Sequence, residues 1–352
     1  MKNFYPKGRV KKMINSDLCH ELLVKKIQPK LRYSAKLDYA KWKEKIKEKF
    51  MQLTGLTEIS KNACPLNIQI EWEKDKGAYR LIRFTFDSEL GETVPCYLLI
   101  PNTKKKKYPV AITLQGHSTG FHNSIGEPKY EGDEKNYPRT AFALQAVQNG
   151  FVALAIEQRG MGERKPMRYD RLPEANCRYA SMVAIALGRT LLGERIWDVH
   201  KAIDALSYFP ECDLDKILIT GNSGGGTMSY YAACFDERIK ISVPSCSFSP
   251  YATSILDIAH CNCNYMPGMY QHFEMQDLAC MIAPRCLSII TGKEDTIFPL
   301  EGVRLGFETV KSIYEKNGAR ENCSLIETPK DHWWCVDIVW GEINRLCKHL
   351  NW

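Results

Sequence analysis

The chain has 352 residues, of which 44% are hydrophobic and 25% are charged, and its formal net charge is +7. This length allows one large α/β domain or two smaller ones, and this apolar content is sufficient for a sizeable core. No apolar stretch approaches the length of a membrane span, and the N-terminus lacks the apolar core of a secretory signal. Basic runs at Lys43–Lys49 and Lys104–Lys107 have no interleaved aromatic residues, so we expect solvated surfaces and no nucleic-acid partner.

The chain contains 14 cysteines without a framework spacing, and many of them stand inside apolar segments. This usage predicts free thiols and a cytoplasmic location. One local cluster, His260-Cys261-Asn262-Cys263 with His272 beyond it, raises the question of a metal site. Its spacing is not a common zinc spacing and no second cysteine pair follows, so we expect an ordinary loop and no metal.

Residues 1–60 are charged and lysine-rich but carry apolar residues at helical spacing. Leu37, Trp42 and Ile46 fall on one face of a helix, with lysines on the other. We therefore predict a helical N-terminal extension of two or three short helices that packs on the main domain, residues 61–352. The alternative is a mobile basic tail.

From residue 66 the apolar residues alternate with polar ones, which is typical of strands. Strands are expected at 68–72, 81–86 and 94–100, the last two forming a hairpin closed around residues 88–92. A further strand, Pro109–Leu114, leads into Gln115-Gly116-His117-Ser118-Thr119-Gly120. Gly116 in this loop allows close approach of the backbone to a ligand.

Residues 139–149 are predicted to form a helix and residues 151–156 an unbroken apolar strand, as in a buried parallel sheet. That strand ends in the charged loop Glu157-Gln-Arg159-Gly-Met-Gly-Glu. Loops at the carboxyl ends of central strands lie near the ligand in open α/β sheets. Arg159 is expected to brace such a site by pairing with a carboxylate, and the alternative is an ordinary surface arginine.

Residues 164–187 interrupt the strand–helix rhythm and are predicted to pass over the site, before a long helix at 190–209. An apolar strand, Ile217–Thr220, then runs into Gly221-Asn222-Ser223-Gly224-Gly225, and a helical segment, Met228–Phe235, follows. Strand, G-x-S-x-G and helix are the context of a nucleophile elbow. The flanking glycines avoid a Cβ clash on a sharp turn, which presents the Ser223 hydroxyl and aims the Gly224 N–H at a developing oxyanion.

The rest of the chain supplies partners for this serine. A strand at 239–244 precedes a second irregular segment, residues 247–279, which we predict to shape the pocket with 164–187. Another strand, 284–292, ends in a loop where Asp295 is favoured over Glu294 as the acid. A helix at 301–317 and a last strand at 323–327 lead to His332, before a final helix at 336–350.

Chain order and local pattern distinguish the candidate histidines. His349 also follows Asp295 but stands beside Lys348 in a surface pattern, so His332 is the expected base. His117 and His122 precede the serine, whereas hydrolases with an elbow place their histidine after it. The His117 N–H is predicted to be the second oxyanion donor, with Gly116 and Asn222 in supporting positions.

The motifs together resemble the acetyl xylan esterase and dienelactone-hydrolase-like branch of the α/β-hydrolase superfamily, over about residues 60–350. They are Gln115–Gly120, Glu157–Gly162, Gly221–Thr227, Met266–Met269 with Ile282–Arg285, Gly292–Asp295 and Asp331–Trp333. The resemblance implies a mostly parallel sheet flanked by helices, with residues 61–352 as the catalytic domain and 164–187 and 247–279 as cap insertions. Many relatives carry Asp-x-Arg-Gly where this chain has Glu157-Gln-Arg-Gly.

The activity that the resemblance implies is ester hydrolysis by Ser223, His332 and Asp295, without a metal or a cofactor. The expected substrate is a small-molecule ester, with an acetyl group on a sugar or similar alcohol as the leading choice. Two other hypotheses are a peptidase or amidase on the same fold and a hydrolase-fold protein that binds a ligand without turnover. Neither nucleic acid nor membrane is expected as a partner, and a homo-oligomer is left open.

Overall fold

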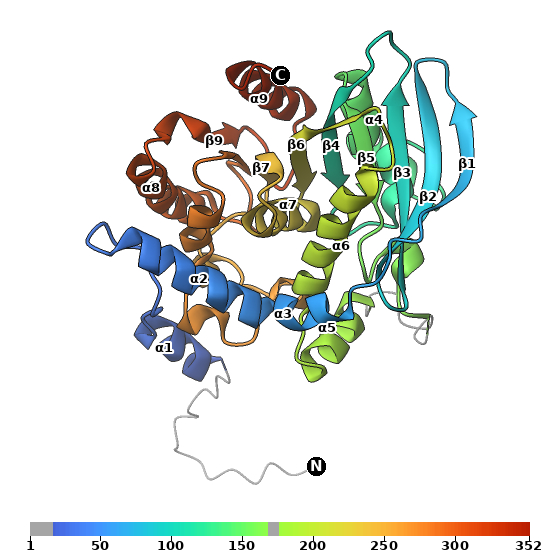
Figure 1. Ribbon diagram of the computed structural model, residues 1–352. Helices are drawn as coiled ribbons and strands as arrows, with labels where there is room; N and C mark the ends of the chain where they lie inside the picture. The colour runs from blue at the N-terminus through green and yellow to red at the C-terminus, as the bar shows by residue number, and fades with distance from the viewer. Residues whose placement is uncertain (1–16, 168–175) are drawn as a thin grey trace, which may run out of the picture.

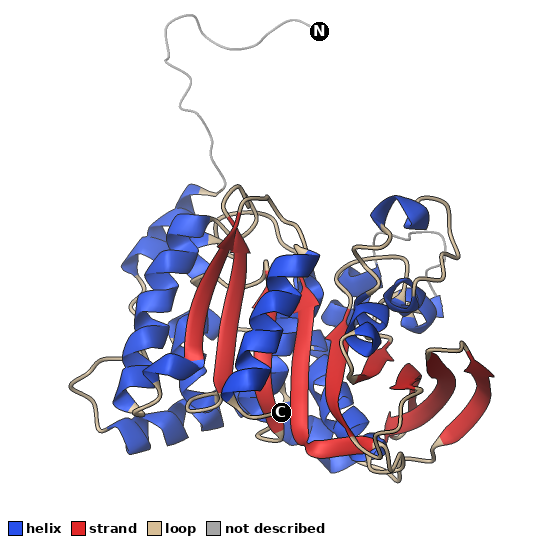
Figure 2. Cartoon of the chain, turned by 90° about the horizontal axis from the view of Figure 1, so that it is seen from above, coloured by secondary structure: helices blue, strands red, loops and turns tan. Residues whose placement is uncertain are grey.

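The computed structural model describes residues 17–167 and 176–352. The predictions for residues 1–16, and for residues 168–175 of the first insertion, lie outside this described part. A nine-stranded sheet forms the centre of the molecule, and helices cover both of its faces (Figures 1 and 2). The chain therefore has the layered α/β architecture that its alternation of apolar strands and amphipathic helices predicts.

The strand order across the sheet is β1-β2-β3-β5-β4-β6-β7-β8-β9. Pairs from β1 to β5 are antiparallel, and the remaining neighbours, from β5 through β4 to β9, are parallel. Because parallel strands have their carboxyl ends at one edge, the loops after β4, β5, β6, β8 and β9 meet there. The strands are β1 (Gln69–Asp75), β2 (Tyr79–Glu89), β3 (Glu92–Pro101), β4 (Tyr108–Leu114), β5 (Val152–Ile156), β6 (Cys212–Asn222), β7 (Ile239–Ser245), β8 (Cys286–Gly292) and β9 (Cys323–Thr328).

The helices divide between the two faces of the sheet. Helices α4 and α9 pack in one apolar cluster with one face, and α2, α3, α6, α7 and α8 pack in another with the opposite face. Coverage on both sides explains why β5 and β8 are buried along their whole length. The helices are α1 (Leu18–Lys26), α2 (Tyr39–Thr54), α3 (Leu56–Ile59), α4 (Phe142–Gln148), α5 (Asn176–Ala186), α6 (Leu191–Leu206), α7 (Gly224–Phe235), α8 (Leu300–Lys316) and α9 (Val336–His349).

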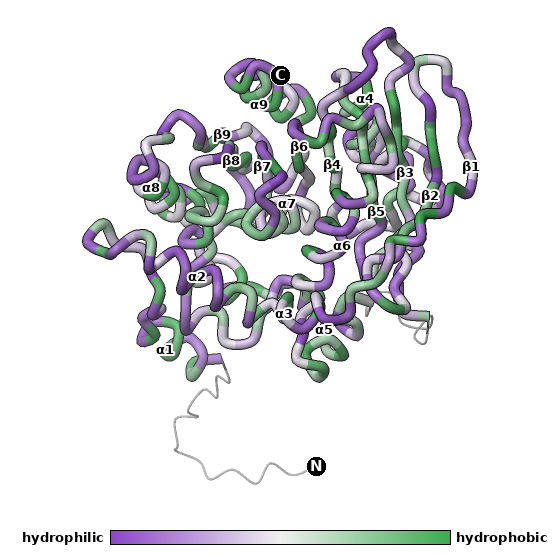
Figure 3. Tube along the Cα trace, viewed as in Figure 1, coloured by the Kyte–Doolittle hydropathy of each residue, from purple (hydrophilic) through white to green (hydrophobic). Residues whose placement is uncertain are grey.

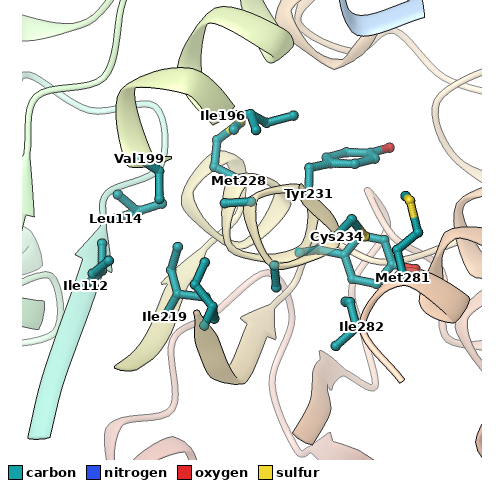
Figure 4. Packing of buried hydrophobic residues seen from close by; sticks show 14 of the residues in the cluster. Ile112, Leu114, Ile196, Val199, Ile219, Met228, Tyr231, Cys234, Met281 and Ile282 are labelled. Carbon is teal, nitrogen blue, oxygen red and sulfur yellow. The ribbon is translucent and has the colours of Figure 1, made fainter. Parts of the chain in front are cut away.

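Helix α7, which follows the predicted elbow, is enclosed on all sides. Every residue from Gly224 to Cys234 is buried. Figure 4 shows Met228 and Tyr231 of this helix among Ile196 of α6 and Ile219 of β6. A helix held by such dense packing gives the residue at its N-terminus a fixed position.

Helices α2 and α3 of the N-terminal segment are part of the core, whereas α1 has no buried residue. Helix α2 buries Trp42, Ile46 and Phe50, and the Phe50 ring stacks on Tyr231 of α7 at 6.0 Å. The prediction that Leu37 shares this face is wrong, because Leu37 lies before the helix and is 38% exposed. The domain boundary at residue 60 stays a prediction.

The two irregular segments differ in the structure. Residues 176–186 of the first form α5, which the sequence did not indicate, because Met182 and Val183 are exposed and no single apolar stripe runs along the helix. Residues 247–279 contain only short 3₁₀ helices: η7 (Tyr251–Thr253), η8 (Asn262–Asn264), η9 (Met269–Gln271) and the start of η10 (Met275–Met281).

The second basic run and the cysteines have the exposure and the bonding state that the sequence predicts. Lys104–Lys107 are exposed in the loop between β3 and β4, which is hydrophilic in Figure 3. All fourteen cysteines are free, as predicted. Within residues 17–167 and 176–352, no helix combines the length and the apolar character needed to cross a bilayer.

Candidate active site

Ser223 occupies a sharp turn between β6 and α7, at the carboxyl edge of the sheet. Its backbone has φ 56° and ψ −124°, which a residue with a Cβ adopts only under strain. The Ser223 N–H donates to the Ser245 carbonyl oxygen on β7 at 2.9 Å, and Thr227 N–H donates back to the Ser223 carbonyl at 2.8 Å. The strand, strained serine and helix reproduce the elbow geometry that the sequence predicted.

The glycines around Ser223 are needed because neighbouring backbone passes through the space of a side chain. A Cβ on Gly221 or on Gly225 would overlap the Leu114 carbonyl oxygen at the end of β4. A Cβ on Gly116, in the loop after β4, would lie 2.9 Å from the Asn222 carbonyl oxygen and 3.2 Å from the Ser223 Cβ. The loop after β4 therefore lies directly against the elbow.

His332 and Asp295 come together from the loops after β9 and β8. His332 Nδ1 lies 2.8 Å from Asp295 Oδ2, and Asp295 Oδ1 accepts the N–H groups of Ile297 at 2.8 Å and Phe298 at 3.0 Å. Burial acts to raise the pKa of Asp295, but the bond and charge of His332 and the two backbone N–H groups outweigh it and lower that pKa. Asp295 is thus held as a carboxylate facing the imidazole.

The second imidazole nitrogen of His332 is available for chemistry. His332 Nε2 is buried and has no hydrogen-bond partner among the described residues. His332 and Ser223 line the same cavity, of about 400 Å³. No hydrogen bond joins Ser223 Oγ to His332 Nε2 in the described structure, and serine–histidine bonds of this kind commonly shorten only in the substrate complex.

Two backbone N–H groups flank the serine in the predicted oxyanion positions. In the described part of the chain, neither the Gly224 N–H nor the His117 N–H donates to another protein group. The two positions are close, since a Cβ on Gly224 would lie 3.3 Å from the His117 ring. Asn222 Oδ1 accepts from Ser245 Oγ at 2.8 Å, and Asn222, Gly116 and His117 all line the cavity. Their roles as donors and supports stay predictions.

Much of the cavity wall comes from residues 123–142, which the sequence did not indicate as part of the pocket. Residues 115–142, between β4 and α4, supply most of the lining, including Asn123, Asp133, Asn136, Arg139 and Thr140. The predicted insertions 164–187 and 247–279 contribute no residue to this cavity among those described, although Lys165, Cys177 and Cys261 line a neighbouring one of about 570 Å³. This polar wall carries both hydrogen-bond donors and acceptors.

Arg159 pairs with a carboxylate, but away from Ser223. Its Nε and Nη2 donate to the two oxygens of Asp198 on α6 at 2.9 Å each, and Nη2 lies 2.7 Å from Glu89. Arg159 is buried and does not line the cavity. It therefore ties the loop after β5 to α6 and to the β2–β3 hairpin, which supports the site at a distance.

The other histidines considered from the sequence have different partners. His122 is buried, its Nε2 lies 2.8 Å from Asp133 Oδ2, and it is not among the residues that line the cavity. His349 is near the C-terminal end of α9, with Nε2 2.7 Å from Asn322 Oδ1. The His117 ring lies beside Cys263, with Nε2 3.4 Å from Sγ. Among His117, His122, His332 and His349, only His332 both pairs with a carboxylate and lines the cavity that contains Ser223.

Glu157 is a buried acid that the sequence reading gave no role. It accepts from Gln115 Nε2 at 2.6 Å and from the N–H groups of Phe121 and Glu163 at 3.2 Å each. Burial raises its pKa to about 7. The carboxyl group thus joins the loop after β5 to the loop that bears Gly116 and His117. Its position at the end of a buried strand was the feature of the sequence that could have indicated this role.

Glu157→Gln is expected to change the pH dependence of stability. A carboxyl group with a raised folded-state pKa stabilises the fold fully below its ordinary pKa, near 4.5, and loses that contribution as pH rises toward 7. Between pH 5 and pH 8, the free energy of unfolding of the wild type should fall by up to roughly 3 kcal/mol more than that of the variant. Denaturant unfolding at both pH values measures this difference.

Glu163→Gln is the matched control for that experiment. Partial burial of Glu163 is outweighed by its ion pair with Arg83, so its pKa is lowered. Its contribution is present at neutral pH and is lost in acid, so this variant should keep the wild-type loss between pH 5 and pH 8. An equal pH profile for Glu157→Gln and wild type would contradict the assignment of that loss to Glu157.

Comparison with known proteins agrees with this fold. A model described as the Abhydrolase family matches residues 9–239, which is more than half of the chain. The chain belongs to the Abhydrolase family. The matched segment contains the elbow, and the superfamily expected from the sequence motifs is confirmed, whereas Asp295 and His332 lie beyond the match.

Individual relatives of this Abhydrolase chain are distant in sequence. YtaP of Bacillus subtilis (strain 168), named as a hydrolase, is 26% identical over 263 residues, which are 74% of this chain and 84% of the relative. A Bacteroides fragilis NCTC 9343 structure named as an acetyl xylan esterase has TM-score 0.78 at 16% identity, covering 96% of this chain and 97% of the other. A glucuronoyl esterase from Solibacter usitatus has TM-score 0.63 at 15% identity, covering 92% and 98%. These structures establish a shared fold.

Proposed function

We propose that this protein is a serine carboxylic-ester hydrolase that removes a small acyl group, with acetyl the expected one, from a carbohydrate or similar alcohol. The observation that supports it best is the His332–Asp295 pair, at 2.8 Å, in a cavity that also holds Ser223 on a strained turn. An imidazole with a carboxylate on one nitrogen and a free second nitrogen has the arrangement of a general base.

The mechanism follows from these groups. His332 Nε2 takes the Ser223 hydroxyl proton as Oγ attacks the ester carbonyl, and Asp295 keeps the proton on Nδ1 and stabilises the imidazolium. The Gly224 and His117 N–H groups hold the oxyanion, an interaction that can supply about 3 kcal/mol for each donor. The alcohol leaves with the proton from His332. Water, activated by the same imidazole, then releases the acyl group and restores Ser223.

The cavity supports a hydroxylated alcohol. A volume of about 400 Å³ lies within the usual range of small-molecule sites. Asn123, Asn136, Arg139 and Thr140 on its wall offer hydrogen bonds to sugar hydroxyl groups. Two structures of this fold, from Bacteroides fragilis and Solibacter usitatus, are named as an acetyl xylan esterase and a glucuronoyl esterase, respectively.

Active-site labelling tests the proposal. A fluorophosphonate probe should modify one residue per chain, mapped by mass spectrometry to the peptide containing Ser223, and hydrolysis of p-nitrophenyl acetate should disappear in parallel. Rates should fall from acetate to longer acyl chains. Turnover of a dipeptide p-nitroanilide with no turnover of acetyl esters would favour an amidase, and a folded protein that is neither labelled nor active would favour ligand binding without catalysis.

A further inference from the structure

Four potential metal ligands converge beside the candidate active site. They are His117 of the loop after β4, Cys177 of α5, and Cys261 and Cys263 at η8. One donor atom of each lies within 4.8 Å of those of the other three. Cys263 Sγ lies 3.2 Å from Cys261 Sγ and 3.4 Å from His117 Nε2.

These separations suit a single tetrahedral ion. Zinc binds cysteine sulfur at about 2.3 Å and histidine nitrogen at about 2.0–2.1 Å, so ligand atoms at the corners stand about 3.6–3.8 Å apart. The sulfur–sulfur distance of 3.2 Å and the sulfur–nitrogen distance of 3.4 Å reach these values if each ligand atom shifts by a few tenths of an ångström. Three thiolates and an imidazole are a recognised zinc-binding set.

The charge around the cluster points to thiolates. Arg195 is fully buried, and its Nη2 donates to Cys177 Sγ at 3.2 Å. Its other acceptor is the Arg159 carbonyl oxygen, and no carboxylate among the described residues forms an ion pair with it. A buried guanidinium without a counter-charge is costly. Three thiolates with one divalent ion carry a net charge of −1, which Arg195 neutralises.

A disulfide explains the positions of these side chains less well than a bound metal ion does. A bonded pair of sulfurs is about 2.05 Å apart, well below the 3.2 Å between Cys261 and Cys263. A disulfide between any two of the three cysteines would also not explain why the third sulfur and the imidazole lie close to them. It would provide no anion to balance the charge of Arg195.

We propose that His117, Cys177, Cys261 and Cys263 bind one zinc ion in a closed Cys₃His site. The proposal departs from the expectation from the sequence that the cysteine–histidine cluster is an ordinary loop. The spacing along the chain pointed to His260, but His260 Nε2 lies 3.0 Å from Ser254 Oγ. The proposed ligand His117 stands 146 residues before Cys263, so the local spacing does not reveal it.

Four protein ligands leave no open coordination position, so the ion is structural. It fastens the loop after β4 to α5 and to the segment 247–279. His117 and Cys177 and Cys261 line the cavity of about 570 Å³, which gives the ion a path from solvent. If the proposed function holds, the ion also fixes the backbone of His117, whose N–H is the proposed oxyanion donor.

Metal content is the direct test. Wild-type protein purified without chelator and dialysed against metal-free buffer should contain about one zinc per chain by plasma mass spectrometry. Cys261→Ser/Cys263→Ser should contain less than one tenth of that amount. The matched control Cys234→Ser, a buried cysteine whose Sγ contacts the Leu278 carbonyl, should retain it.

Cobalt substitution keeps the test independent of variant folding. Wild-type protein exchanged with Co²⁺ should show sulfur-to-cobalt charge-transfer absorption and the intense visible bands of tetrahedral cobalt. Wild type that has neither zinc nor these bands after exposure to both ions overturns the proposal, as does a denatured thiol count two below fourteen, which indicates a disulfide. Because metal content does not depend on ester turnover, either proposal can fail without the other.

Discussion

Ser223→Ala should lower kcat for p-nitrophenyl acetate by roughly 10⁵- to 10⁶-fold, the scale found when a triad nucleophile is removed. In the proposed mechanism, the variant loses the atom that forms the acyl-enzyme, and His332 then has no hydroxyl to activate. The oxyanion donors and the cavity stay in place, so a small rate above the uncatalysed one should persist. Stopped-flow or long-time hydrolysis assays on both proteins measure the ratio.

Ser247→Ala is a suitable control for that loss. Ser247 is also a buried serine near the elbow, and its hydroxyl has no partner among the described residues. It is outside the residues that line the Ser223 cavity, so its rate should equal that of wild type. Both variants should unfold at temperatures close to wild type. Equal rates for Ser223→Ala and wild type would remove the assignment of Ser223 as nucleophile.

The sequence was informative wherever local chemistry fixes geometry. The G-x-S-x-G segment requires glycine because the Leu114 carbonyl oxygen passes against the turn, and that constraint is visible as a short motif. Strand β5 and the apolar runs within β6 and β8 could be predicted for a similar reason, since burial on both faces favours apolar residues along them. Asp295 and His332 were predicted from their order along the chain, and in the structure His332 Nδ1 lies 2.8 Å from Asp295 Oδ2.

Contacts between distant segments could not be read from the sequence. The pocket wall at residues 115–142 has little regular structure beyond the short helices η2 (Phe121–Ile125) and η3 (Asp133–Asn136), so no periodicity marks it. The convergence of His117, Cys177 and Cys261 depends on how the loop after β4, helix α5 and the segment 247–279 pack together. Spacing rules detect metal sites only when ligands are close along the chain.

Asp295→Asn is expected to lower kcat by about 10⁴-fold with little change in stability of the fold. The reason lies in the hydrogen bonds of the two carboxylate oxygens. Oδ1 accepts two N–H groups, from Ile297 and Phe298, so the amide oxygen of an asparagine must occupy that position. The amide NH₂ then faces His332 Nδ1, which must accept a hydrogen bond, and the ring proton moves to Nε2. An imidazole with a proton on Nε2 cannot take the proton of Ser223.

Glu294→Gln separates this effect from a general loss of charge in the loop. Glu294 is the exposed neighbour of Asp295 and was the alternative acid in the sequence. Its replacement removes one negative charge from the same loop but leaves the His332 tautomer unchanged, so kcat should stay at the wild-type value. Similar losses in both variants would mean that loop charge, and not the orientation of the imidazole, governs the rate. Both variants remove one negative charge, but only Asp295→Asn changes the contact with His332 Nδ1. A loss of kcat confined to Asp295→Asn would therefore mean that the oxygen of residue 295 holds the proton on Nδ1.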